Sequence, residues 1–101
     1  MREAETLCRT ILRESPGEAG IHHLLGVLSH HMGKNEEARK AIESAIALNP
    51  NDAEYHNNLG VVLLGMGDVQ QALAACARAV ELRAQYPEAW NNLGNAMAAA
   101  G

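Results

Sequence analysis

The chain has 101 residues and a formal net charge of −4, and its hydrophobic residues reach 48% while its aromatic residues reach only 3%. This length allows one small domain, whose core is built mainly from aliphatic side chains. The acidic balance and the scattered basic residues argue against a nucleic-acid partner, because phosphate binding needs a basic patch.

The first half of the chain has a helical pattern, with apolar residues that recur every three or four positions. The predicted helices span residues 2–14, 19–32 and 35–48. Turn residues separate them: Pro16 follows the first, Gly33 follows the second, and Pro50 follows the third.

The second half repeats this arrangement, with predicted helices over residues 53–66, 69–82 and 87–100. Asp52 and Asp68 precede the first two and are good N-cap residues, because a carboxylate accepts hydrogen bonds from the first free backbone N–H groups. Pro87 fits the first position of the last helix.

A period of 34 residues runs through the chain. It relates Gly26, Gly60 and Gly94, and each of these follows a leucine. The other positions in phase are the rings His22, His56 and Trp90; the glycines Gly33, Gly67 and Gly101; the small residues Ala4, Ala38 and Ala72; the set Cys8, Ile42 and Cys76; and Pro16 with Pro50. Such a period indicates stacked two-helix units, which bury their apolar faces only against neighbours.

A two-helix unit of 34 residues that reads Trp-x-x-Leu-Gly, then Gly, then Ala-x-x-x-aromatic-x-x-Ala, then Pro resembles the tetratricopeptide repeat over the whole chain. The resemblance implies an all-α fold: an α-solenoid of six helices, in which antiparallel pairs form a right-handed superhelix. The single domain, 1–101, then comprises an outer-helix half repeat (1–16), two repeats (19–52 and 53–86) and an inner-helix half repeat (87–101). The chain departs from the family by having histidine at two ring positions and Cys8, Ile42 and Cys76 at an aromatic position.

The resemblance also implies that the first helix of each unit lines a concave groove. The charges support this division, because the first helices carry only Glu54 and Glu88 while the second helices carry most of the rest. The predicted partner-binding residues are His23, Leu24, Val27, His31, Glu54, Asn57, Asn58, Val61, Glu88, Asn91, Asn92 and Asn95. Because the two glutamates occupy the groove, we expect no clamp of lysine and arginine for a terminal carboxylate.

Two asparagine pairs, Asn57-Asn58 and Asn91-Asn92, are expected on the concave side. A side-chain amide has donors and an acceptor, so it pairs with the backbone of an extended peptide. The ladder of Asn58 and Asn92 is similar to the repeat region of O-linked N-acetylglucosamine transferases. The alternative is structural: the first asparagine of each pair is only solvated, and the second bonds the adjacent unit.

The predicted function is a protein–protein interaction module that binds an extended peptide or partner segment in the groove. One alternative is a scaffold that assembles head-to-tail, or as a swapped homo-oligomer, through its terminal helices. The residues predicted for that self-association are Leu7, Ile11, Trp90, Leu93 and Met97. Another alternative is the substrate-docking fragment of a larger glycosyltransferase-like enzyme.

The sequence predicts no catalytic residues, no metal site and no cofactor. His23 and His30 share a helix face but lie about 10 Å apart along the axis, too far to bind one ion. Cys8 and Cys76 are two units apart, roughly 20 Å with layers of about 10 Å, so we expect no disulfide between them. With no apolar run of about 20 residues and a charged beginning, we expect a cytoplasmic protein that does not enter the membrane.

Overall fold

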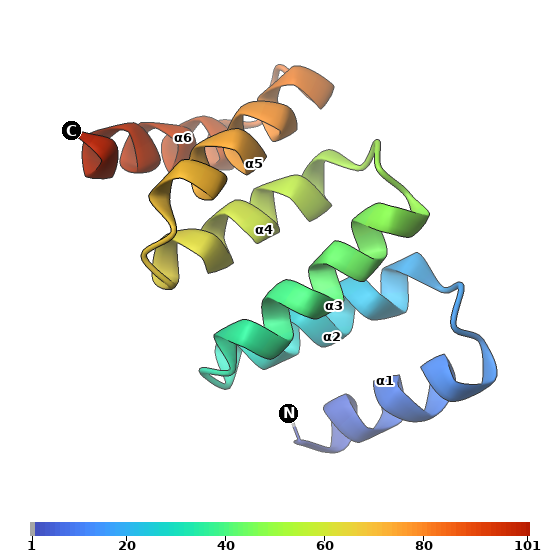
Figure 1. The fold of residues 1–101 in the computed structure, drawn as a ribbon. Helices are drawn as coiled ribbons and strands as arrows, with labels where there is room; N and C mark the ends of the chain where they lie inside the picture. Colours follow the sequence, from blue (N-terminus) through green and yellow to red (C-terminus); the bar gives the residue numbers. More distant parts are fainter. Residues whose placement is uncertain (1) are drawn as a thin grey trace. The chain divides into compact units, whose positions relative to one another are not determined.

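The computed structural model describes residues 2–101, and that range folds into six α-helices without a strand (Figure 1). The helices are α1 (Arg2–Glu14), α2 (Ala19–His31), α3 (Asn35–Leu48), α4 (Ala53–Gly65), α5 (Val69–Leu82) and α6 (Pro87–Ala100). Four of them match the predicted bounds, and α2 and α4 each end one residue early. The all-α helical class predicted from the sequence is confirmed.

Local chemistry sets the helix ends. Oδ1 of Asp52 accepts hydrogen bonds from the backbone N–H groups of Glu54 and Tyr55, at 3.0 and 3.4 Å, and thereby caps α4. Asp68 caps α5 through the N–H of Gln71. After α2 and α4 the chain turns in the left-handed region, at glycines with φ of 77° and 79°, where a side chain would be strained.

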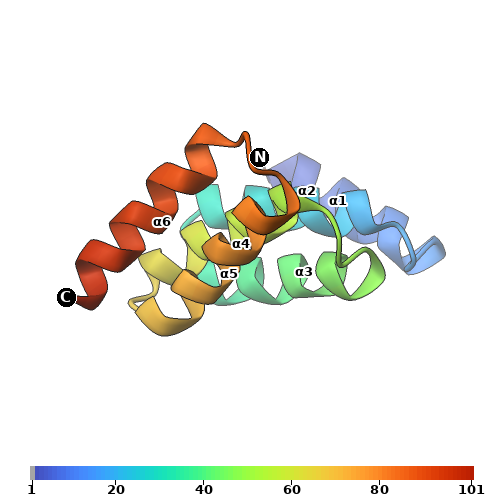
Figure 2. The ribbon, with the colours of Figure 1, turned by 90° about the horizontal axis from the view of Figure 1, so that it is seen from above.

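The chain divides into two compact units, one ending at Pro50 and the other beginning at Asn51. In the first unit α2 packs against both α1 and α3. In the second unit α5 packs against α4 and α6, and α6 also contacts α4 (Figure 2). Each unit therefore consists of three packed helices with their own apolar interior.

Small side chains form much of the two interiors. In the first unit Cys8, Leu25 and Ala41 form a buried cluster from three helices. In the second unit the buried clusters are Ala53, Ala79, Val80, Tyr86 and Ala89, and Leu63, Ala72, Ala75 and Ala96. Alanine side chains at helix contacts allow the short end of the 8–10 Å range of interaxial distances.

Two glycines show how closely the paired helices approach. A Cβ atom on Gly26 would overlap Cγ1 of Ile42, and one on Gly60 would overlap Sγ of Cys76. Each partner lies on the helix that comes after the glycine's own, at the same position of the repeat. Glycine at these two positions of the repeat therefore permits the close packing of the paired helices.

The two cysteines are buried thiols that are not joined to each other. Burial raises the pKa of the Cys8 and Cys76 thiols, which favours their protonated form. Among residues 2–101 no three metal-binding side chains are grouped so as to hold an ion. No helix in that range has the length and apolar character needed to cross a membrane.

Candidate functional site

A hydrogen bond between two asparagines joins α4 to α6 in the second unit. Nδ2 of Asn92 donates to Oδ1 of Asn57 at 2.9 Å, and these residues are 35 positions apart, one more than the repeat period. The first asparagine of one pair therefore bonds the second asparagine of the next pair. This bond uses one amide hydrogen of Asn92, so the oxygen and the second hydrogen of that amide are not engaged in it.

The expectation that Asn57 lies at the edge of a groove, open to a partner, is wrong. Its side chain is only 2% exposed, because it lies at the junction of α4 and α6 where Asn92 reaches it. A buried amide needs hydrogen-bond partners, and Tyr86 is a second one. The two asparagines are 35 residues apart in the sequence, whereas the period of 34 relates equivalent positions. The period therefore predicts no contact between Asn57 and Asn92.

Tyr86 forms a hydrogen bond with Asn57 at this junction, and the charges around it shift the pKa of its hydroxyl. Burial raises the pKa of the Tyr86 hydroxyl, and the negative charges of Glu54 and Glu88 raise it further. The nearby Arg83, whose Cζ lies 4.6 Å from the centroid of the Tyr86 ring, and the hydrogen bond with Asn57 oppose this shift. Glu54 and Glu88, each in the first turn of its helix, thus both raise the pKa of the Tyr86 hydroxyl.

The other predicted residues of this unit reach solvent to different degrees. Glu54, Glu88, Asn91 and Asn95 are exposed, and Asn58, Val61 and Asn92 are partly buried. We refer to Glu54, Asn58, Val61, Glu88, Asn92 and Asn95, which share faces of the two helices by helical spacing, as the α4–α6 surface. It has two carboxylates and three amides, and neither α4 nor α6 contains a lysine or arginine.

The predicted residues of α2 belong to the first unit. Leu24 is 45% exposed, His31 is exposed, and His23 and Val27 are partly buried. Their role in binding stays a prediction for that unit.

The rings at the first position of the Leu-Gly motif have a local role that the sequence did not reveal. Nε1 of Trp90 donates to the carbonyl oxygen of Ala84 at 2.7 Å. Nε2 of His22 lies 2.9 Å from the carbonyl oxygen of Pro16, also six residues earlier. Each ring nitrogen therefore connects its helix to a backbone carbonyl of the turn before it.

The residues predicted for self-association divide into two groups. Leu7, Trp90 and Met97 are 60%, 51% and 59% exposed, whereas Ile11 and Leu93 are partly buried. Leu93 packs against the buried cluster that contains Tyr86. Gly94 lies between Trp90 and Met97 on α6, and no atom lies within 4 Å of the position its Cβ would take.

The chain matches a known repeat family over most of its length. A family model of the tetratricopeptide repeat matches residues 31–87 and, in a second match, residues 62–101. No curated protein matches the sequence.

Solved structures share the fold. A mutant O-GlcNAc transferase of Thermobaculum terrenum is similar with 35% identity and a TM-score of 0.87, over 92% of this chain and 18% of the transferase. MamA is similar with 23% identity and a TM-score of 0.95, over 99% of this chain and 55% of MamA. The first tetratricopeptide repeat domain of Spaghetti, bound to the HSP90 peptide SRMEEVD, has 19% identity and a TM-score of 0.95, over 98% of this chain and 79% of that domain. The chain thus spans less than a fifth of the transferase and about half of MamA.

Proposed function

The chain belongs to the tetratricopeptide repeat family, and from this premise we propose that it binds an extended segment of a partner protein along the inner helices of its repeats. Tetratricopeptide repeats are protein–protein interaction modules, and one structural neighbour of this chain was solved with a peptide bound. In the second unit the proposed contact is the α4–α6 surface.

The observation that carries this proposal is the bond between Asn57 and Asn92. It joins the two inner helices, and the Asn92 amide stays partly exposed one turn before the exposed amide of Asn95. Amides on a rigid pair of helices present donors and acceptors without a charge, which suits the backbone of an extended peptide.

The charges on this surface set a preference among peptides. Glu54 and Glu88 are exposed at the beginnings of the two helices, neither helix contains a lysine or arginine, and Arg83 beside Tyr86 balances only one of the two charges. An acidic peptide is therefore repelled, whereas a neutral or basic segment is accepted. The proposed ligand differs in this respect from SRMEEVD, the peptide bound to the Spaghetti domain.

An array of capped ten-residue peptides of varied charge tests the proposal. We expect neutral and basic peptides to bind and acidic ones to bind weakly, with NMR amide shifts around Asn58 and Asn95. The variant Glu88→Lys should raise the Kd of a basic peptide about fivefold, as one reversed exposed charge changes binding by about 1 kcal/mol.

The matched control is Glu81→Lys, which reverses an exposed carboxylate on α5, outside this surface. It should leave the Kd within about twofold. Equal effects of the two variants, or NMR shifts confined to α5, would contradict the proposal.

Self-association is a second candidate function, favoured by the open position at Gly94. The equivalent glycines, Gly26 and Gly60, each contact a side chain of the next helix, whereas Gly94 has no such neighbour. On α1, Leu7 is 60% exposed, although its equivalents Ala41 and Ala75 are buried. The α1 helix of a second copy would cover the exposed side of α6 in a head-to-tail contact.

The similarity to the O-GlcNAc transferase supports a third role, in which the chain is the docking part of a larger glycosyltransferase-like protein. That role uses the same α4–α6 surface, and the bound segment would then be a substrate of the attached enzyme.

A further inference from the structure

A cavity of about 810 Å³ opens in the first unit among α1, α2 and α3. Its apolar floor contains Leu12, Leu25 and Ala41, of which Leu25 and Ala41 belong to the buried cluster of that unit. The volume lies within the 300–1,000 Å³ range of ligand pockets in proteins. None of its lining residues is among those predicted to bind a partner, so it is separate from the proposed peptide contact.

Positive charge surrounds this floor. Arg9 and Arg13 line the cavity from α1, and Lys40 lines it from α3. The carboxylate that lines it is Glu37, which accepts a hydrogen bond from Nη2 of Arg9 at 3.1 Å. The lining thus has a surplus of two positive charges in a chain whose net charge is −4.

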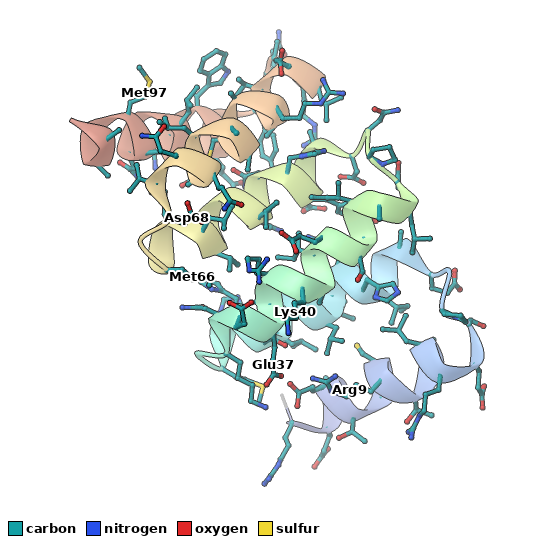
Figure 3. All side chains as sticks on the ribbon, in the orientation of Figure 1. Arg9, Glu37, Lys40, Met66, Asp68 and Met97 are labelled. Atoms are coloured by element: carbon teal, nitrogen blue, oxygen red, sulfur yellow. The ribbon has the colours of Figure 1, made fainter. Side chains whose placement is uncertain are left out.

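The bond between Arg9 and Glu37 spans the cavity mouth. Figure 3 shows these side chains reaching toward each other from α1 and α3, with Lys40 on the same side of α3. Arg9 is also 3.8 Å from Glu5, so its charge is already shared between two carboxylates. Arg9 and Glu37 therefore connect α1 to α3 through a half-exposed ion pair, in which Arg13 and Lys40 take no part.

Arg13 and Lys40 are the cations of this lining that lie outside a direct ion pair, although the pKa of Glu36 on α3 is lowered chiefly by Arg39 and also by the charge of Lys40. Among residues 2–101 neither forms an ion pair with a carboxylate. Arg13 donates only to the hydroxyl of Thr10, at 3.3 Å, which lies on its own helix. Two such cations, one on α1 and one on α3, together with the apolar floor match a ligand with two carboxylates and an aliphatic group between them.

We infer that this cavity binds a short acidic peptide segment in which an aliphatic side chain lies between two carboxylates. The aliphatic side chain packs on Leu12, Leu25 and Ala41, and the carboxylates pair with Arg13 and Lys40. The apolar floor favours this ligand over a polyphosphate or nucleic acid, which have no aliphatic side chain to pack on it.

The probe is the capped peptide acetyl-Gly-Glu-Leu-Glu-Gly-amide, titrated into the ¹⁵N-labelled full chain. We expect amide shifts around Arg13 and Lys40, together with little change around Asn95. The double variant Arg13→Gln/Lys40→Gln should raise the Kd about tenfold, since each exposed ion pair contributes up to about fivefold. The same peptide with glutamine in place of both glutamates should lose a similar factor.

The control is Arg2→Gln/Arg78→Gln, which removes two exposed cations outside the cavity and changes the net charge equally. Its Kd should stay within about twofold of the wild-type value. Circular dichroism should show that both double variants are folded. Equal losses in the two variants, binding of the glutamine peptide with unchanged Kd, or shifts that map to α4 and α6 would each overturn the inference.

Discussion

Three glycines at one repeat position have different surroundings. At Gly26 and Gly60 a Cβ atom would overlap a side chain of the next helix, so only glycine allows the observed packing. At Gly94 the same position is open. The sequence shows three equivalent residues, and their environments determine what each substitution does.

Replacing Gly60 by alanine should lower the free energy of unfolding by about 1–2 kcal/mol, because overpacking against Sγ of Cys76 exceeds the gain in helix propensity. Gly94→Ala should instead raise it by about 0.5–1 kcal/mol, since α6 gains a better helix former without a clash. Urea unfolding monitored by circular dichroism measures both.

A double variant tests whether overlap with Sγ of Cys76 causes the loss of stability in Gly60→Ala. Cys76→Ala removes the sulfur, and the next atoms near the new Cβ lie at 3.5 and 3.6 Å, in ordinary contact. Gly60→Ala should therefore cost much less in the Cys76→Ala background, by a coupling of about 1 kcal/mol. Additive effects would show that the overlap is relieved in another way.

At the scale of the element, the helices begin in different ways. Asp52 and Asp68 cap α4 and α5 with side-chain hydrogen bonds, whereas Glu18 and Lys34, which precede α2 and α3, form none to the helix. Lys34 instead pairs with the buried Glu5, at 3.3 Å, and so joins the α2–α3 turn to α1. In the second unit, aspartate caps thus stabilise the helix beginnings, whereas in the first unit an ion pair stabilises the α2–α3 turn.

The Asp52 cap should be worth about 1 kcal/mol, the usual cost of replacing such a residue by alanine. Asp52→Ala should lower the urea midpoint accordingly, because two backbone N–H groups lose their acceptor. Asp52→Asn keeps an oxygen in place and should change stability by only a few tenths of a kcal/mol. Equal losses in the two variants would mean that the charge, and not the hydrogen bonds, stabilises α4.

At the scale of the whole molecule, the three most exposed large apolar side chains lie on the first and the last helix. Leu7 is on α1, and Trp90 and Met97 are on α6. Two different surfaces that fit each other make a heterologous contact, which extends from copy to copy unless it closes into a ring. The proposed self-association is of this kind.

Sedimentation equilibrium should show oligomers that grow with protein concentration. Leu7→Glu and Met97→Glu should each prevent growth, because a buried unpaired charge is costly. An equal mixture of the two variants should form a dimer and stop there, since one intact surface remains on each variant. Leu24→Glu, at a 45% exposed leucine of α2, is the control. A strict monomer at high concentration would contradict this proposal.

The helices and their order follow from the amino-acid sequence alone. The 34-residue period, the turn residues and the caps predicted six helices, and the observed bounds differ by at most one residue. The sequence also placed Gly26 and Gly60 at close helix contacts. The helix ends depend on chemistry within one or two turns of the chain, whereas the glycine positions follow from the 34-residue repeat.

Only the tertiary structure decided which side chains are available to a partner. Asn57 and Asn91 are equivalent in the repeat, yet the first is buried against Asn92 and the second is exposed. The cavity beside Arg13 and Lys40 likewise draws its lining from three helices. Burial and charge at these places depend on the packing of helices distant in sequence, so a local pattern does not contain them.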